Sequence, residues 1–104
     1  AFADGLEEAE RALALAPDLA EAHAIRARIL SEGGRQDAAA PALETALRLD
    51  PESYEVNRAA AYIRYRQHRT PEAIHYFEKA LSLAATDVNS ASMLMSCYHT
   101  IGDP

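Results

Sequence analysis

Apolar and small side chains recur along this chain with a period of 34 residues. Within each period most of them lie three or four residues from another member of the set, which is typical of one face of an α-helix and not of the alternation of a β-strand. The middle set, with the proline that follows it, is Ala39, Leu43, Ala46, Leu47, Leu49 and Pro51. The equivalent positions 34 residues later hold Ala73, Phe77, Ala80, Leu81, Leu83 and Ala85. The equivalent positions 34 residues earlier hold Gly5, Ala9, Ala12, Leu13, Leu15 and Pro17. A helical repeat of this length predicts stacked helical hairpins, because one hairpin cannot bury its apolar face alone.

The residues between these positions predict where helices begin. We expect six helices, over residues 4–16, 18–32, 36–49, 51–67, 70–84 and 87–100. The predicted starts are the capping boxes Asp4–Glu7 and Asp18–Glu21, the cap-then-proline pairs Asp50-Pro51 and Thr70-Pro71, and the cap Asp87. Because the connections are short, neighbouring helices must run antiparallel.

Proline and glycine mark the helix ends. Pro17 stops the first helix, while Gly33 and Gly34 end the second by allowing left-handed backbone angles. Gly102 ends the last helix in the same way. Pro41 lies about a turn inside the third helix, where it removes one backbone donor. Its position is consistent with a slightly bent start to that helix or with a tolerated first-turn proline.

The composition fits one small helical domain spanning residues 1–104. The chain has 23 alanines and few β-branched residues. Its net charge of −6 makes it a poor general binder of nucleic acid, because it would repel phosphates. No apolar run approaches the ~20 residues that span a bilayer, and no signal-peptide pattern opens the chain. We therefore expect a cytoplasmic protein without membrane contact.

The pattern resembles the tetratricopeptide repeat (TPR), a family of 34-residue helix-turn-helix units with small residues where two helices touch. We call the two helices of each hairpin its first arm and its second arm. The small residues that carry the resemblance are Ala27 and Ala61 on first arms and Ala39, Ala46, Ala73 and Ala80 on second arms. The bulky residue between the small residues of a second arm is Leu43 or Phe77. The proline between repeats is Pro17 or Pro51. The resemblance implies an all-α, right-handed superhelical solenoid with full repeats over 20–53 and 54–87 and half repeats over 1–19 and 88–104. It also implies a function in protein–protein interaction.

Several positions depart from the family pattern and leave local packing open. The large apolar residue expected early in each first arm is replaced by His23, Asn57 and Ala91. Arg64 stands where Tyr or Leu is usual, Met95 replaces a small residue, and His68 replaces the glycine found at Gly34 and Gly102.

The segments RALALAPDLAEAHAIRARIL and ALRLDPESYEVNRAAAY are similar to a bacterial subgroup of this family. In that subgroup the repeats follow a catalytic or DNA-binding regulatory domain, for instance in proteins of the adenylate/guanylate cyclase type. The resemblance implies a segment of a larger bacterial signalling protein. Both ends of the pattern are half repeats, and the last helix carries Met93, Leu94, Met95, Cys97 and Tyr98 with no second arm to cover them. Because uncapped repeat arrays expose apolar surface, we expect self-association through the ends.

No motif of this chain indicates catalysis. It has neither a glycine-rich phosphate loop nor a nucleophile elbow, so we expect no enzyme activity and no cofactor. The four histidines, His23, His68, His75 and His99, are spaced so that no two share a helical turn, which argues against a metal site. The single cysteine, Cys97, permits no internal disulfide, and we interpret it as a small helix residue.

The candidate binding surface is the face of the first arms that neither packing interface needs. On a helical wheel of the fourth helix, Arg58, Tyr62, Tyr65 and Arg69 form one stripe with Glu55 and Arg66 beside it. The same geometry selects Glu21, Ala24, Arg28 and Ser31 on the second helix and Asn89, Ser92, Ser96 and His99 on the last. We expect Val56 and Ile63 to pack on the preceding repeat, and Ala60 and Ala61 to face the partner arm.

The charge distribution sharpens this prediction. Residues 54–70 carry four arginines against one glutamate, a local charge of +3, so the remainder of the chain carries −9. Tyr and Arg are enriched at binding hot spots, and a basic strip in an acidic protein favours an acidic or carboxylate-bearing peptide. The alternative is that these arginines are ordinary solvated residues paired with neighbouring acids.

The sequence therefore predicts a protein–protein interaction scaffold. The predicted partner-binding residues are Arg28, Arg58, Tyr62, Tyr65, Arg69, Asn89, Ser96 and His99. Two alternatives stay open: a structural spacer or self-association module, and accessory repeats of an enzyme whose catalytic domain lies elsewhere. The predicted core contains Ala39, Ala46, Leu47, Ala73, Phe77, Ala80 and Leu81.

Overall fold

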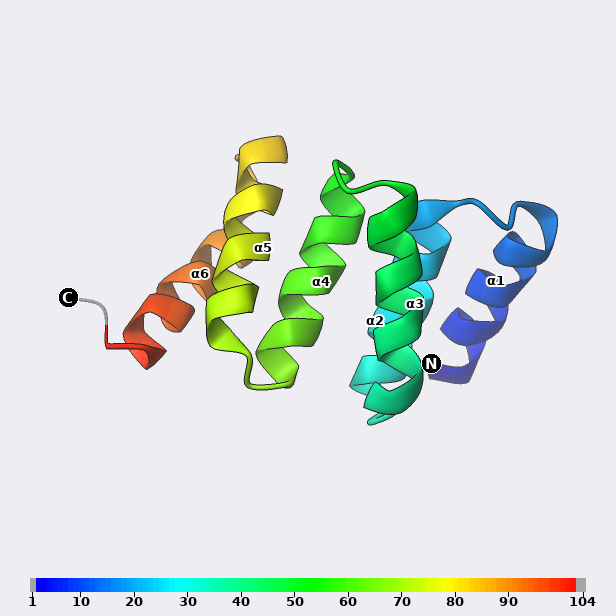
Figure 1. Cartoon of the computed structure of the whole chain (residues 1–104), viewed down its shortest axis with the longest axis horizontal. Helices are drawn as coiled ribbons and strands as arrows, with labels where there is room; N and C mark the ends of the chain where they lie inside the picture. Colours follow the sequence, from blue (N-terminus) through cyan, green and yellow to red (C-terminus); the bar gives the residue numbers. More distant parts are fainter. Residues whose placement is uncertain (1, 103–104) are drawn as a thin grey trace.

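Six α-helices make up the part of the chain that the computed structural model describes, which is residues 2–102, with side chains from residue 5 onward (Figure 1). They are α1 (Phe2–Leu15), α2 (Ala20–Glu32), α3 (Gln36–Leu49), α4 (Tyr54–Arg66), α5 (Thr70–Leu83) and α6 (Val88–Thr100). These 101 residues contain no β-strand. The predicted all-α architecture of six helices is confirmed. None of the described helices has the length and apolar character needed to cross a bilayer.

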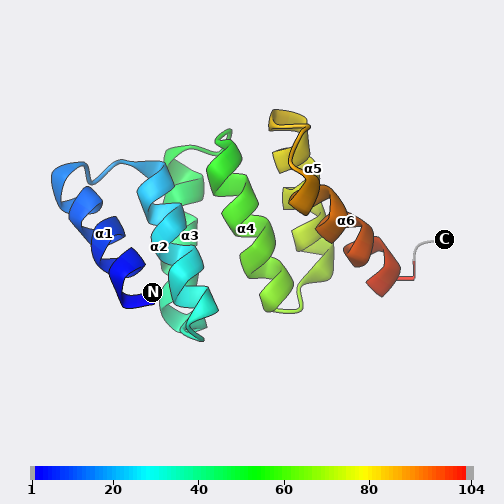
Figure 2. The same cartoon turned by 180° about the vertical axis from the view of Figure 1, so that it is seen from behind.

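The helices form an elongated row in which successive helices alternate in direction (Figure 1). The first arms α2, α4 and α6 lie towards the viewer in Figure 2, and the second arms α3 and α5 lie on the opposite side, towards the viewer in Figure 1. First-arm residues that are neither in the hairpin interface nor between repeats therefore share one face of the molecule.

Alanines allow the helices to approach closely, and one bulky residue fills the space between each pair of arms. Ala27 packs in one cluster with Leu43, and Ala61 packs in another with Phe77 and Cys97. All five of these side chains are fully buried. The predicted core residues Ala39, Ala46, Ala73, Phe77 and Ala80 are buried, whereas Leu47 and Leu81 are only partly buried.

Packing between repeats follows the predicted faces with one exception. Val56 lies in a cluster with α2 and α3 residues of the preceding repeat, and Ile63 in a second one, as predicted. Ala61 faces the partner arm α5, also as predicted. The prediction for Ala60 is wrong, because Ala60 packs against Ala27 and α3 of the preceding repeat. The helix turns by about 100° per residue, so two adjacent alanines point to different neighbours.

Several predicted helix starts are wrong. Asp4 lies inside α1, which begins at Phe2. Leu19, not Asp18, is the residue before α2, and it offers no side-chain cap. Likewise α5 begins at Thr70 itself, with Arg69 as the preceding residue. The prediction for Asp87 is correct, since its side chain accepts a hydrogen bond from Ser90 N at the start of α6.

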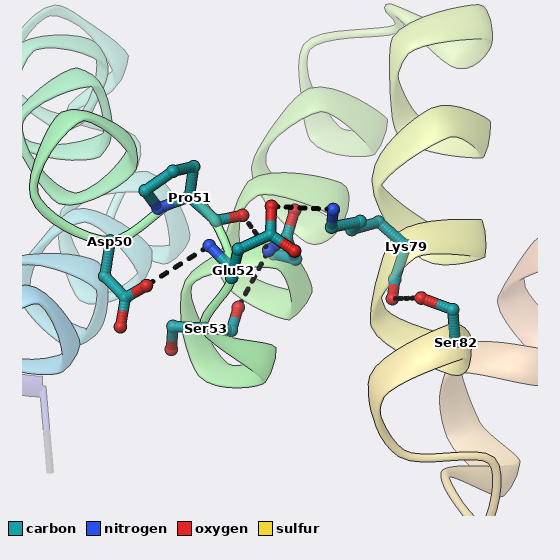
Figure 3. A network of polar contacts seen from close by, with 7 residues as sticks. Asp50, Pro51, Glu52, Ser53, Lys79 and Ser82 are labelled. Carbon is teal, nitrogen blue, oxygen red and sulfur yellow. Dashed lines mark hydrogen bonds and ion pairs between the residues drawn. The ribbon is translucent and has the colours of Figure 1, made fainter.

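The predicted start at Asp50-Pro51 is replaced by a turn (Figure 3). Asp50 Oδ1 accepts a hydrogen bond from the Glu52 N–H at 3.2 Å, which closes a local turn instead of opening a helix. Helix α4 starts three residues later, where Ser53 Oγ accepts from Val56 N. Lys79 of α5 reaches the turn through a 2.9 Å ion pair with Glu52.

The glycine position of each repeat requires a left-handed backbone. Gly34 has φ of 82° and Gly102 has φ of 76°, as predicted for helix-ending glycines. Gly33 has φ of −84°, so the prediction that it also adopts a left-handed angle is wrong. His68 takes φ of 61° at the equivalent position, although it has a side chain. Helix α3 continues without interruption through Pro41.

Polar residues at positions where the family has apolar ones find hydrogen-bond partners. Asn57 is buried, and its Nδ2 donates to the carbonyl of Pro51 at 3.0 Å. One repeat earlier, His23 Nε2 donates to the carbonyl of Pro17 at 2.8 Å. Arg64 is mostly buried, and its Nη1 donates to Gln67 Oε1 at 2.9 Å. These contacts explain how the solenoid accommodates the three departures.

Candidate functional site

The predicted first-arm stripe is centred on the ring of Tyr62. The guanidinium carbon of Arg28 lies 5.1 Å from the centre of this ring, and that of Arg58 is also 5.1 Å away. Arg28 comes from α2, whereas Arg58 and Tyr62 are one turn apart on α4. Distances of this size favour cation–π attraction, so the stripe links two successive repeats.

Tyr62 is held in place by the core beneath it. Its ring meets the buried Phe77 ring edge-on, with centroids 5.3 Å apart and an angle of 83° between the planes. Such T-shaped pairs are favourable because the positive edge of one ring meets the negative face of the other. The helical wheel predicts that neither packing interface needs this stripe. That interpretation is wrong for Tyr62, whose ring both packs on the core and contacts the arginines.

Arg58 belongs to a polar cluster at the starts of α4 and α6. Its Nε lies 3.3 Å from Asp87 Oδ2. The same carboxylate accepts hydrogen bonds from the Tyr54 hydroxyl at 2.5 Å and the Ser90 hydroxyl at 2.5 Å, and from Ser90 N at 3.1 Å. Asp87 is almost fully covered, with 7% of its side chain exposed. Sequence reasoning identified Asp87 only as a cap and missed this cluster.

Two pKa values are shifted in this cluster. Burial disfavours the charge on Asp87, but hydrogen bonds from Ser90 and Tyr54 and the charge of Arg58 outweigh burial and lower the pKa of Asp87 to about 2. The hydrogen bond to Asp87, together with burial, raises the pKa of Tyr54 to about 12. Asp87 is therefore ionised and Tyr54 protonated at neutral pH, so the cluster carries one positive and one negative charge.

The remaining predicted site residues are more dispersed. Tyr65 is exposed and lines a hollow of about 500 Å³ together with Arg66, His68 and parts of the turns that follow α2 and α4. Ser96 and His99 line a shallower hollow on α6. Asn89 is exposed near the start of α6. The structure thus brings Arg28, Arg58 and Tyr62 together, with the other residues of the first arms at the sides.

Arg69 does not belong to the helical stripe. Helix α4 ends at Arg66, so the helical wheel does not apply to Arg69, which precedes α5. Its Nε donates to Glu72 Oε1 at 2.7 Å. Arg28 also has an acidic neighbour, since its Nε lies 3.2 Å from Glu32 Oε2. The alternative in which arginines pair with nearby acids therefore describes part of this surface correctly.

Chemistry beyond binding has little support in this arrangement. Among the described residues, no three His, Cys, Asp or Glu side chains are grouped closely enough to hold a metal ion. Cys97 is a buried free cysteine, and burial raises the pKa of its thiol. A protonated thiol is a poor nucleophile, so the interpretation of Cys97 as a packing residue agrees with its surroundings.

Comparison with known proteins places this geometry in a familiar architecture. The family model described as "Tetratricopeptide repeat" matches residues 20–53. A solved structure, "Structure of Naa15/Naa10 bound to HypK-THB", matches 98% of this chain with a TM-score of 0.91. The fold is that of a TPR solenoid.

The similarity to that structure is low in sequence and involves only a small part of the matched chain. The two chains are 24% identical, and this chain covers 16% of the length of the matched chain. No curated protein matches the chain. The likeness therefore establishes how the helices are stacked, and α2 and α4 present the Arg28–Tyr62–Arg58 contact on the first-arm face of that stack.

Proposed function

We propose that the chain is a protein-interaction module that holds a peptide or a helix of a partner protein against the first-arm face of α2, α4 and α6. The observation that carries this proposal is the placement of Arg28 and Arg58 at 5.1 Å from the Tyr62 ring, across the junction of two repeats. A preorganised aromatic ring with two cations offers flat contact area and hydrogen-bond donors at low entropic cost. Tyr65 extends this surface, and Asn89, Ser96 and His99 lie at its sides.

The partner is an acidic or carboxylate-bearing segment. Residues 54–70 carry a net charge of +3 in a chain of −6. Arg64 and Arg69 lie beside Glu72 and off this face, so an acidic peptide would be drawn to it by Arg28 and Arg58. Arg28 is partly exposed, and its guanidinium has donors beyond the one that faces Glu32. The matched solved structure contains Naa15/Naa10 bound to HypK-THB, which supports a protein partner for this fold in general terms.

The module acts by display and has no reaction of its own. We assign it to a cytoplasmic, larger bacterial signalling protein, in which the repeats recruit or position another domain. A second function, self-association, is favoured by large apolar side chains exposed on the outermost helices, of which Val88 and Met95 of α6 are examples.

A peptide titration followed by NMR tests the binding face. The ligands are acidic peptides with a free C-terminal carboxylate, and their amidated and neutral counterparts serve as specificity controls. Amide shifts around Arg28, Tyr62 and Tyr65 are expected, with affinity falling as salt rises because the site is accessible to ions. The double variant Arg28→Ala, Tyr65→Ala should bind at least tenfold more weakly. Arg48→Ala, an exposed arginine on α3, is the matched control.

Two outcomes of this titration would overturn the first-arm face as the binding site. If acidic peptides bind the double variant as tightly as the wild type, or if the shifts map to α3 and α5, the first-arm face is not the site. Melting curves of both variants accompany the titration, so that loss of fold cannot be mistaken for loss of binding.

A further inference from the structure

The ends of three successive first arms border a polar hollow beside the first-arm face. Helices α2, α4 and α6 all end along the same edge of the row of helices, the lower edge in Figure 1. The hollow at this edge has a volume of about 500 Å³, which is within the size range of ligand pockets. Its walls include Glu32 and Gly34 from the end of α2, Tyr65, Arg66 and His68 from the end of α4, and Thr100 of α6. Its central helix, α4, has a first arm before it and a first arm after it, so the hollow belongs to the interior of the repeat array.

One helical turn joins this hollow to the proposed binding face. Tyr62 and Arg66 are four residues apart on α4, and Arg28 and Glu32 are four residues apart on α2, so the members of each pair are neighbours on the helix surface. The pair on α2 is also in contact, since Arg28 Nε lies 3.2 Å from Glu32 Oε2. A partner segment that lies on the Tyr62 ring and follows α4 towards its end therefore reaches the hollow next.

Arg66 brings an uncompensated positive charge to the hollow. Residues 54–70, all of which the structure describes, contain four arginines. Three of them have an acidic side chain within ion-pair distance: Arg58 has Asp87, and Arg64 and Arg69 share Glu72. The exposed Arg66 forms no hydrogen bond or ion pair with any described residue through its side chain. The acid at the rim, Glu32, already faces Arg28, so the charge of Arg66 is available to a ligand.

His68 is the second unusual residue of the hollow. Its φ of 61° is left-handed, and the equivalent residues of the neighbouring repeats, Gly34 and Gly102, have no side chain at this position. Backbone strain of this kind is concentrated at ligand-binding and other functional sites. The side chains of His68 and Tyr65 are both exposed and make no hydrogen bond to another described residue. The strained turn thus carries a ring with a hydrogen-bond donor at the hollow, where the neighbouring repeats have only backbone.

Side-chain amides join the two turns that border the hollow. Gln36 Nε2 donates a hydrogen bond to Oγ of the buried Ser31 at 3.0 Å, and Gln67 Nε2 donates to Gln36 Oε1 at 3.3 Å. These contacts connect the turn after α2 with the turn after α4, so the walls are held in place before a ligand arrives. Binding to a preformed site loses less free energy to the ordering of side chains.

We propose that this hollow is a second anchoring site of the interaction module and takes the carboxylate side chain of one acidic residue in the partner segment. Arg66 supplies the charge, and the Tyr65 hydroxyl and the His68 ring donate hydrogen bonds to the carboxylate oxygens. Glu32 at the rim repels a doubly charged group more strongly than a singly charged one, which favours a carboxylate over a phosphate. The inference rests on the proposed function, since the segment must already lie on the first-arm face, and it makes His68 a specificity-determining residue.

The first experiment combines variants of the protein with variants of the peptide. The probe is an acidic peptide from the NMR titration, in versions with each glutamate replaced singly by glutamine. Arg66→Gln should weaken binding of the parent peptide by about tenfold or more, because it removes the charge of the anchor. Against one of the substituted peptides the same variant should change the Kd by less than about twofold, because the carboxylate that Arg66 holds is already absent. If the effect of Arg66→Gln disappears only with the amidated peptide, the hollow binds a chain terminus and a side-chain site is overturned.

The second experiment tests whether His68 serves binding at a cost to the fold. His68→Gly should weaken binding of the parent peptide by about three- to tenfold while raising the melting temperature, because the ring is lost and the backbone strain is relieved. His68→Asn also tolerates a left-handed backbone but does not reach as far, so a similar loss of affinity would attribute the effect to the ring and not to a more flexible turn. Unchanged affinity in both variants, or a His68→Gly variant that loses both affinity and thermal stability, would overturn this role of His68.

Two further variants separate the hollow from the function on which it rests. Arg28→Ala reports on the first-arm face, and Arg48→Gln, at an exposed arginine of α3, is the matched control for Arg66→Gln. If Arg28→Ala weakens binding but Arg66→Gln binds as tightly as the control, the first-arm face stands and the hollow is overturned. If no acidic peptide binds the wild type, both are overturned. Phosphoserine in place of the identified glutamate should bind no more tightly, and a gain of more than about tenfold would overturn the assignment to a carboxylate.

Discussion

The hydroxyl of Tyr54 donates a 2.5 Å hydrogen bond to the carboxylate of Asp87, joining the start of α4 to the start of α6. The two residues are 33 positions apart, almost one repeat. Asp87 also caps α6 and pairs with Arg58, so one carboxylate fixes a helix start, the spacing of two first arms and one cation of the proposed binding face.

Asp87→Asn should lower the free energy of unfolding by about 1–3 kcal/mol at pH 7, because an amide cannot replace a carboxylate towards all of these donors. The folded pKa of about 2 lies below the ordinary value of 3.8, so the contribution is complete above about pH 5 and is lost as the pH falls towards 2. The difference between wild type and variant should therefore shrink over this range.

Urea unfolding at pH 7, 4 and 2.5 measures that difference. Asp37→Asn, at an exposed residue of α3, serves as the control and should change little at any of these pH values. A stability gap for Asp87→Asn that stays constant down to pH 2.5 would contradict the assignment of the low pKa to this cluster.

Phe77→Ala should cost about 3–5 kcal/mol, because the ring is fully buried among α4, α5 and α6 and its loss opens a cavity. The Tyr62 ring would also lose its edge-on partner. Chemical denaturation gives the value, with Tyr65→Ala as an exposed aromatic control expected to change stability by less than about 0.5 kcal/mol. A loss below ~1 kcal/mol for Phe77→Ala would be incompatible with the core described above.

Asn57→Ala should destabilise the chain by about 1–3 kcal/mol. The variant removes a 2.8 Å hydrogen bond to the buried Ser53 carbonyl, and it also removes the partly buried 3.0 Å hydrogen bond to the Pro51 carbonyl. His23→Ala removes the equivalent contact to Pro17, but His23 is only partly buried, so its effect should be smaller. Thermal melts of the two variants compare them directly, and equal losses would argue that burial does not set the cost.

The period of the sequence predicted the hairpins, the buried alanines and the side of the molecule to which Arg28 and Tyr62 contribute, because these depend on spacing alone. Helix starts were harder to predict. Asp50 resembles a cap in sequence, yet its carboxylate satisfies the Glu52 N–H in a turn. Whether Asp50 caps a helix or closes a turn depends on Ser53, which caps α4 three residues later. Asp50 and Ser53 are both favourable cap residues, so the local sequence does not decide between them.

The polar cluster around Asp87 was beyond sequence reasoning for a different reason. It requires Tyr54 and Arg58 of α4 to reach Asp87 at the start of α6, and the spacing of residues along one helix does not specify where the next first arm lies. Arg69 shows the opposite error: a helical wheel was extended past Arg66, where α4 ends. Patterns of spacing predict faces well inside a helix and lose their meaning where the helix stops.

His68 offers a prediction in which the variant is more stable than the wild type. The residue has φ of 61°, at the position where the neighbouring repeats have Gly34 and Gly102. A left-handed conformation costs an ordinary residue ~1–2 kcal/mol, and glycine avoids this cost. Part of the gain is offset because glycine also gives the unfolded chain more conformational freedom. His68→Gly should therefore raise the free energy of unfolding by about 0.5–1 kcal/mol.

The reciprocal change isolates the backbone effect. A Cβ added at Gly34 would meet no atom within 4 Å, so Gly34→Ala introduces no clash, and its expected loss of ~1–2 kcal/mol comes from the φ of 82° alone. Urea unfolding of both variants against wild type tests the pair. His68→Gly could prove destabilising while Gly34→Ala is destabilising as expected. In that case the His68 side chain must make contacts that outweigh the strain of its backbone. The hollow that His68 lines together with Tyr65 is where those contacts would lie.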